Sequence, residues 1–86
     1  MFTPIAPESM AAALRAQRAI SKMSVAEVVD AAARICGSSP RTLQRRLDTA
    51  AGITLDEVNA FAQVFGVPAS HLYKLAALTD SVAVPA

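Results

Sequence analysis

The residues of this sequence with the clearest capacity for chemistry are three arginines and a glutamine in the segment SSPRTLQRRL, residues 38–47. This segment holds three of the eight basic residues of a chain whose net charge is only +1, and it contains no acidic residue. Arginine pairs bidentately with phosphate and guanine, and glutamine pairs in the same way with adenine. Because a packed core requires none of these side chains, the segment predicts a surface that meets a negatively charged partner.

The other charged residues are divided unevenly along the chain. Residues 1–47 carry seven basic and three acidic side chains, a net charge of +4, whereas residues 48–86 carry one basic and four acidic side chains, a net charge of −3. A basic half beside an acidic half is expected for a protein that binds a polyanion with one face. Ordinary surface charge distributed by chance is the alternative interpretation of the charges alone.

Length and composition favour one small helical domain over residues 1–86. The chain is 53% hydrophobic, largely through alanine, and has three Phe, one Tyr and no Trp, whereas a β-sandwich would need more β-branched and aromatic residues. Cys36 is the single cysteine, so no intrachain disulfide can form and a reducing compartment is expected. No apolar segment approaches the length of a membrane span, and residues 1–10 lack the pattern of a signal peptide. We therefore expect a cytoplasmic protein with no membrane partner.

Apolar spacing and capping signals predict five helices. The first covers about residues 8–22. The second and fourth begin at capping boxes, residues 24–27 and 54–57, in which a Ser or Thr N-cap is followed three residues later by glutamate. Gly37 and Gly66 follow these two helices and can end them in the left-handed conformation.

The third helix carries the arginines. It is predicted over residues 39–50, with Ser39 as its N-cap and Pro40 at its first position, where the missing N–H costs nothing. The fifth helix begins at residue 68 or 69 and runs to about Leu78. Residues 79–86 form a tail, either a short strand or a frayed end. Connections of two to four residues between such helices predict a compact all-α fold.

Residues 25–50 have the spacing of a helix-turn-helix. In that motif a small residue lies where the helices cross, a glycine four positions later turns the chain, and an apolar residue six positions further packs the second helix. These three positions are occupied by Ala33, Gly37 and Leu43. With Leu43 directed inward at 100° per residue, Arg41, Arg45 and Asp48 face outward, and Gln44 and Thr42 lie on the flanks. The arginines thus form one outward ridge.

This ridge predicts contacts to duplex DNA. Its arginines and glutamine can read base edges, and the serines and the helix N-terminus can bind backbone phosphates. The predicted DNA-binding residues are Ser38, Ser39, Pro40, Arg41, Thr42, Gln44, Arg45 and Arg46. The alternative is a solvated basic helix face, but the capped turn, the glycine spacing and the absence of acids favour DNA.

At these residues the chain resembles the lambda-repressor-like, Cro/Xre-type DNA-binding domains. The resemblance runs from Leu14 to Leu78, inside a predicted core of residues 8–78, and includes the ending FGVPASHLYKLA. It implies five helices, with the second and third as the reading unit. The positions that it implies for base and phosphate contacts are those of Ser39, Pro40, Arg41, Gln44 and Arg45. In two departures, Arg46 replaces an apolar residue, and the family's acidic partner for a helix-one arginine would fall at Leu47, so the resemblance does not support an Arg18–Asp48 pair.

The string SPRTLQRRL is also similar to the first helix-turn-helix of AraC-type activators, which carry two such units. A faint repeat accompanies it: shifted by 29 positions, the residues Ala33, Ile35, Gly37, Leu43 and Arg45 align with Ala62, Val64, Gly66, Leu72 and Lys74. The second unit, residues 58–76, offers only Lys74 as a cation in an acidic half of the chain. We therefore expect it to be structural and not a second reading head.

The sequence thus predicts a sequence-specific double-stranded DNA-binding transcriptional regulator of phage or bacterial type, a small Cro-like repressor that reads the major groove with helix 39–50. One reading helix covers too few base pairs for operator specificity, so a homodimer on DNA is expected. The candidate dimer contacts are the apolar residues Phe2, Ile5, Val82 and Val84, with the fifth helix as an alternative.

No enzyme activity, metal, cofactor or small-molecule ligand is predicted. His71 is the single histidine and has no neighbouring metal ligands in the sequence, and no glycine-rich phosphate loop is present. Two alternative functions stay open. One is an all-α protein-interaction module, such as an antitoxin, antirepressor or adaptor, and the other is an AraC-like domain with two DNA-reading units.

Overall fold

The computed structural model describes the backbone of residues 7–83 and the side chains of residues 7–78. Five helices, and no strand, occupy this described part of the chain, so the predicted all-α fold is confirmed. The helices are α1 (Pro7–Ser21), α2 (Val25–Cys36), α3 (Pro40–Asp48), α4 (Leu55–Phe65) and α5 (Ala69–Ala83). None of these described helices combines the length and the apolar character that a membrane crossing requires.

Both predicted capping boxes are present and begin α2 and α4. The hydroxyl of Ser24 accepts from Glu27 N at 3.1 Å, and Glu27 Oε1 accepts from Ser24 N at 3.0 Å. Thr54 and Glu57 repeat this pair of bonds at 3.1 and 3.0 Å. The two helices also end as predicted, because a glycine with positive φ follows each of them, 80° at residue 37 and 72° at residue 66. Local sequence therefore determines these four helix ends.

Two helix ends differ from the predictions. The third helix was expected to reach residue 50, but α3 ends at Asp48 and Thr49 has an extended backbone. The fifth helix was expected to stop near residue 78, whereas α5 continues to Ala83, so the predicted tail of residues 79–86 is helical over its first five residues. The sequence has no glycine or proline between Ala69 and Pro85. Because nothing in this stretch breaks a helix, α5 continues beyond the predicted end.

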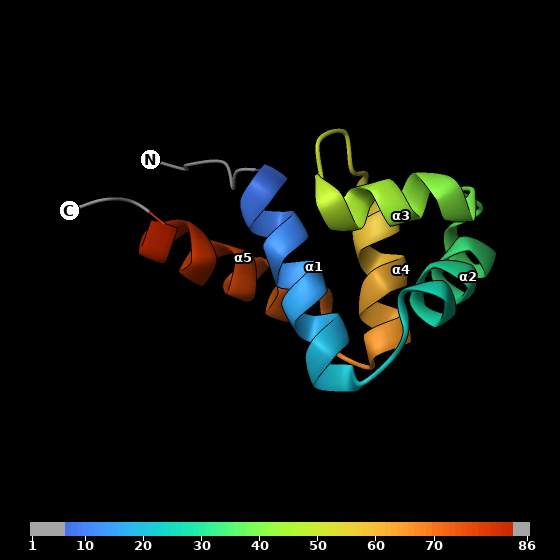
Figure 1. The fold of residues 1–86 in the computed structure, drawn as a ribbon, viewed down its shortest axis with the longest axis horizontal. Coiled ribbons are helices and arrows are strands. Elements are labelled where there is room, and N and C mark those ends of the chain that lie inside the picture. Colours follow the sequence, from blue (N-terminus) through green and yellow to red (C-terminus); the bar gives the residue numbers. More distant parts are fainter. Residues whose placement is uncertain (1–6, 84–86) are drawn as a thin grey trace.

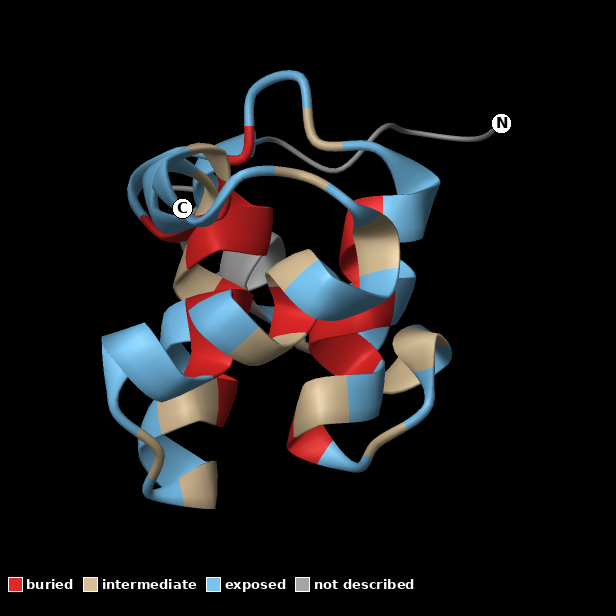
Figure 2. Ribbon diagram, turned by 90° about the vertical axis from the view of Figure 1, so that its right-hand side faces the viewer, coloured by how far each residue is buried: buried red, intermediate tan, exposed pale blue. Residues whose placement is uncertain are grey.

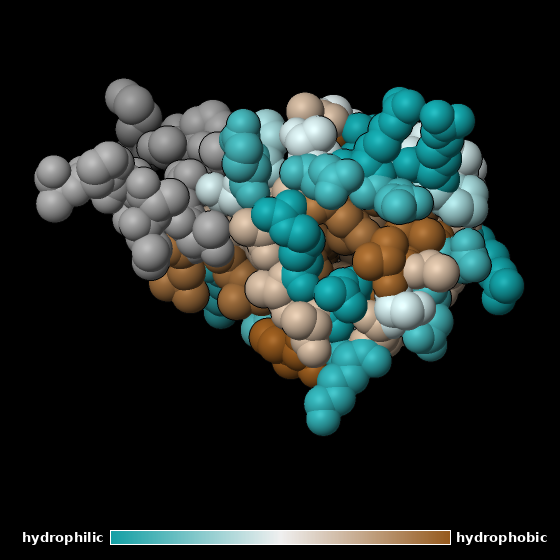
Figure 3. Space-filling model, in the orientation of Figure 1, coloured by the Kyte–Doolittle hydropathy of each residue, from teal (hydrophilic) through white to brown (hydrophobic). Residues whose placement is uncertain are grey.

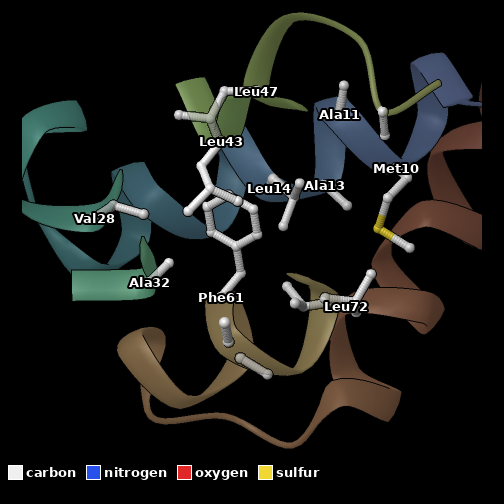
Figure 4. Packing of buried hydrophobic residues seen from close by; sticks show 14 of the residues in the cluster. Met10, Ala11, Ala13, Leu14, Val28, Ala32, Leu43, Leu47, Phe61 and Leu72 are labelled. Carbon is white, nitrogen blue, oxygen red and sulfur yellow. The ribbon is translucent and has the colours of Figure 1, made fainter. Parts of the chain in front are cut away.

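Every helix contributes at least one large, fully buried side chain to the core. These residues are Leu14, Val28, Leu43, Val58, Phe61 and Leu72, of which Val58 and Phe61 both belong to α4. Phe61 of α4 extends toward Leu43 of α3 and Leu14 of α1 (Figure 4). Figure 2 shows the buried residues on the inner sides of the helices and the exposed residues on their outer sides. All five helices thus share one core.

Three sets of contacts hold the helices together. α1 lies against α3, α4 and α5, α2 packs on α3 and α4, and α4 also contacts α5. α5 crosses α1 obliquely, packs against it and continues past the other helices (Figure 1). The molecule has extents of 40 × 24 × 21 Å. α3 crosses one end of this assembly, so its outer side faces away from the core (Figure 1).

Candidate nucleic-acid interface

A three-residue connection, residues 37–39, turns the chain from α2 into α3. Gly37 adopts a φ of 80° and its N–H donates to Ala33 O at 2.9 Å. Ser39 then caps α3, because its hydroxyl accepts from Thr42 N at 3.1 Å and donates to Thr42 Oγ1 at 2.9 Å. Pro40 occupies the first helical turn, as predicted. These local contacts fix where α3 begins and keep Ser39 and Thr42 bonded to each other.

The inner face of α3 is apolar and its outer face is polar. Leu43 is fully buried, Leu47 is nearly so, and Arg41, Gln44 and Arg45 are exposed. No hydrogen bond or ion pair to another described residue holds these three polar side chains. Hydrophilic side chains gather over α3 on the molecular surface (Figure 3). The predicted outward position of Arg41 and Arg45 is therefore confirmed, and Gln44, predicted on the flank, is exposed beside them, while their contact with DNA stays a prediction.

Arg46 and Ser38 do not belong to this outward ridge. Arg46 Nε donates to Glu57 Oε1 at 3.1 Å, Arg46 Nη1 donates to Ala51 O at 2.8 Å, and the side chain is only 20% exposed. Ser38 Oγ donates to Glu57 Oε2 at 2.9 Å. The prediction that Arg46 shares the ridge with Arg41 and Arg45 is wrong. At 100° per residue Arg46 lies only about 60° from Leu43, on the flank that faces α4.

Glu57 is the centre of this second set of polar contacts. Its side chain is almost fully buried at the start of α4 and accepts bonds from Thr54 N, Ser38 Oγ and Arg46 Nε. Burial raises the pKa of the Glu57 carboxyl, but the hydrogen bonds from Thr54 and Ser38 and the charge of Arg46 outweigh burial and hold this pKa below its usual value. The carboxylate is thus ionised at neutral pH and paired with Arg46.

The sequence predicts a capping-box role for Glu57 but not its contacts with Ser38 and Arg46. The available signal was Arg46 itself, which stands where the resembled family has an apolar residue. An arginine on the inner flank of a helix requires an acceptor, since an unpaired buried charge is costly. The spacing of the sequence did not show which of the acidic residues would provide it.

α1 holds the other end of α3. Arg15 Nη1 donates to Leu47 O and Asp48 O, which are carbonyls of the last turn of α3 that have no partner within the helix. This contact explains why α3 can end at Asp48. Arg18 does not pair with Asp48 but donates to Met23 O at 2.8 Å. A shallow hollow of about 170 Å³ separates α1 from α3, and its lining includes both arginines and Gln44.

The second unit, residues 58–76, presents a different surface. The positions on α5 that correspond to Arg41, Gln44 and Arg45 hold Ser70, Tyr73 and Lys74, all exposed. His71 is half-buried, and its Nε2 lies 3.1 Å from Oε1 of the buried Gln17 on α1. α5 is therefore joined to α1 and offers one cation where α3 offers two and a glutamine.

The described residues contain no metal site. No group of three His, Cys, Asp or Glu side chains in residues 7–78 could hold a metal ion, and Cys36 is a free, half-buried cysteine. Of the predicted dimer contacts, Phe2, Ile5 and Val84 lie outside the described residues, and Val82 lies where only the backbone of α5 is described. Comparison with known proteins finds no family model, no curated protein and no solved structure that matches this chain.

Proposed function

We propose that this protein is a sequence-specific double-stranded DNA-binding transcriptional regulator that places α3 in the major groove. One observation carries the proposal: α3 is fixed along its inner face and at its ends, while its outer face presents Arg41, Gln44 and Arg45 without a described partner. The one acidic residue of α3, Asp48, lies at its C-terminal end. Such a helix is a rigid support for side chains that must meet base edges.

The chemistry of these side chains suits base pairs. Gln44 and Arg45 follow Arg41 by three and four residues, so the three side chains are neighbours on one side of α3. Each arginine can donate two hydrogen bonds to guanine O6 and N7, and the glutamine can pair with adenine N6 and N7. The N-terminus of α3 carries a partial positive charge and begins with a first turn free of acidic residues, which favours a nearby phosphate.

Regulation by occupancy is the simplest role for such a domain. A repressor of the Cro-like kind needs only to cover an operator. Because one helix contacts few base pairs, the proposal includes a homodimer on DNA with two half-sites about 34 Å apart, one turn of the duplex. Footprinting on the preferred sequence should show two protected half-sites at this spacing and two protein chains per site. A single short footprint with one chain would remove the dimer from the proposal.

The contact with DNA is tested by selecting bound sequences from random duplex DNA and titrating the preferred site in gel shifts. Arg41→Ala and Arg45→Ala should each weaken binding by about 1–3 kcal/mol and relax the base preference at one position. Lys74→Ala is the matched control, since it also removes one positive charge from an exposed helix side. If both arginine variants bind as tightly as this control, α3 does not read DNA.

A second candidate function is protein binding, and exposed apolar residues favour it. Ile35 at the end of α2 is 45% exposed and Leu55 at the start of α4 is 64% exposed. Salt distinguishes the two functions. DNA affinity should fall with a slope of about −0.9 per neutralised phosphate in a plot of log affinity against log salt concentration, whereas an apolar protein interface should hardly respond.

A further inference from the structure

We propose that Glu57, Arg46 and Ser38 form a positioning cluster that sets how α3 is held against α4, and that Arg46 and Ser38 act through this cluster and not as DNA contacts. The inference rests on the proposed function and extends it to residues that do not touch DNA. Its basis is that three separate segments meet at one buried carboxylate. These segments are the connection between α2 and α3, the second half of α3, and the start of α4.

The two bonds to Glu57 hold α3 at two separated points. Ser38 lies two residues before Pro40, the first residue of α3, and Arg46 lies in its last turn. Glu57 receives the first on Oε2 and the second on Oε1, at 2.9 and 3.1 Å. Apolar contacts of Leu43 and Leu47 keep α3 on the core but are not directional, so they do not by themselves set its rotation about the helix axis. Two directional bonds to one fixed acceptor limit such movement.

Arg46 is enclosed on its remaining side by the loop between α3 and α4. Its Nη1 donates to Ala51 O at 2.8 Å, and a Cβ at Gly52 would lie 3.5 Å from the same nitrogen. Every buried polar side-chain atom in the described residues has a hydrogen-bond partner. The cluster is thus satisfied internally, and Arg46 could reach a phosphate only by leaving Glu57 without its charged partner, which is costly for a buried carboxylate.

The two capping boxes provide a matched pair of variants. Glu27 and Glu57 make the same two bonds to their N-cap residues, but Glu27 is exposed and bonds to Ser24, whereas Glu57 also holds Ser38 and Arg46. Glutamine replaces glutamate in capping boxes. Glu57→Gln therefore preserves the cap and weakens the cluster, and Glu27→Gln makes the same chemical change without a cluster to weaken.

The sign of the effect separates positioning from electrostatics. Both variants remove one negative charge, and charge alone should strengthen the binding of any DNA. If Glu57 positions α3, Glu57→Gln should instead lower the affinity for the selected sequence while affinity for random DNA stays the same or rises. A loss of folded protein alone would lower both affinities by the same factor, so the ratio of the two affinities reports positioning.

The experiment measures binding of the selected sequence and of random duplex DNA by fluorescence anisotropy, with circular dichroism as the check of folding. We expect Glu57→Gln to reduce the ratio of specific to random affinity about tenfold, the size of effect that loss of a charged hydrogen bond gives. Glu27→Gln should keep this ratio within about twofold. Ser38→Ala removes the hydrogen bond from Ser38 to Glu57 and should reduce the affinity ratio by a few-fold. This variant replaces Glu57→Gln in the test if Glu57→Gln does not fold.

Arg46→Met tests the other half of the inference. It should reduce the specific affinity but leave the slope of log affinity against log salt concentration unchanged, and combined with Glu57→Gln it should add little further loss. A slope reduced by about 0.9 would make Arg46 a phosphate contact and overturn the proposal. So would folded Glu57→Gln and Ser38→Ala proteins that keep the wild-type affinity ratio. Arg45→Ala in the same series distinguishes the two proposals. If Arg45→Ala leaves the affinity for the selected sequence unchanged, the proposal that α3 binds DNA is itself wrong.

Discussion

The α2–α3 pair and the α4–α5 pair are built from the same parts, yet they present different surfaces. Each pair opens with a capping box, has a positive-φ glycine after its first helix, and continues through a connection of three residues. Leu43 and Leu72, 29 residues apart, are both fully buried. The second helices differ in their exposed positions, where Arg41, Gln44 and Arg45 of α3 correspond to Ser70, Tyr73 and Lys74 of α5.

The pairs also differ in how the second helix is held. α3 is bonded to α4 through Ser38 and Arg46 and to α1 through Arg15. α5 packs against α1, where His71 meets Gln17, and it continues past the other helices (Figure 1). The same helix-pair design thus supports two different arrangements of its second helix. In α3 the outer face is left free and the helix is short and fixed, whereas α5 is long and closes the core.

The largest expected effect is on DNA binding. Arg45→Glu should abolish binding of the preferred sequence, because it reverses a charge on the outer face of α3, while Lys74→Glu at the corresponding position of α5 should change affinity by no more than a few-fold. Ser70→Glu should behave like Lys74→Glu. Gel shifts with each folded variant measure the difference. Equal damage from the α5 variants would mean that the chain has two reading heads, as in the AraC-like alternative.

The next prediction concerns what the two pairs share. Leu43→Ala and Leu72→Ala each remove a fully buried side chain and should each lower the free energy of unfolding by about 2–5 kcal/mol. Urea denaturation followed by circular dichroism provides the measurement. Leu55→Ala, at a side chain that is 64% exposed, is the control and should stay within about 0.5 kcal/mol of the wild type. A much smaller loss at Leu72 than at Leu43 would show that α5 is only loosely part of the core.

A smaller effect should distinguish the two capping boxes by their response to pH. The pKa of Glu57 is held below its usual value despite burial, so its contribution to stability is present above the pKa of the unfolded chain, about 4.3, and is lost as pH falls through the lower folded value. Glu57→Gln should lower the free energy of unfolding by about 1–3 kcal/mol at pH 7. The difference from the wild type should shrink in acid.

A weaker pH dependence of stability is expected for the capping box of Glu27. Hydrogen bonding to the backbone and the hydroxyl of Ser24 lowers the pKa of Glu27, but this side chain is exposed and has no arginine partner. Glu27→Gln should therefore change both the stability at pH 7 and its acid dependence less than Glu57→Gln does. Urea titrations between pH 3 and 7 test this order, and equal pH profiles for the two variants would show that Arg46 and Ser38 add nothing to the cap.

The turns should show smaller effects than truncation of the core residues. Gly37→Ala and Gly66→Ala place a side chain at positive φ without any atom within 4 Å of the new Cβ, so each should cost only the backbone strain, about 1–2 kcal/mol. Lys22 is the non-glycine residue with positive φ in the described chain, at 56°, and Lys22→Gly should have the opposite sign. Thermal unfolding of the three variants gives the comparison. A clearly larger cost at Gly37 than at Gly66 would indicate that the first turn is the more constrained one.

Much of the fold could be predicted because its signals are local. The glutamates three residues after Ser24 and Thr54 and the glycines at 37 and 66 determine four helix ends within a few residues of sequence. The outward position of Arg41 and Arg45 follows from helical periodicity once Leu43 is placed inside. These features depend on neighbours along the chain and not on the tertiary arrangement.

The features that were missed depend on residues far apart in the sequence. Arg46 pairs with a glutamate 11 residues away that already had a sufficient role in its capping box, so nothing local indicated a second one. α3 ends early with its last carbonyls bonded to Arg15, 32 residues before Leu47. The predicted tail, a short strand or a frayed end from residue 79, is instead helical through Ala83, because no glycine or proline lies between Ala69 and Ala83 to stop the helix.

The position of α1 has a consequence for how the molecule unfolds. α1 touches α3 from one pair and α4 and α5 from the other, and its Leu14 meets Phe61 in the shared core. If α1 detaches, water reaches the apolar sides of both the α2–α3 pair and the α4–α5 pair. The two pairs are therefore not independent cooperative units, despite their similar construction. The domain should therefore open as a whole, with one transition in denaturant and with the most slowly exchanging amides distributed over α1, α3 and α4 together.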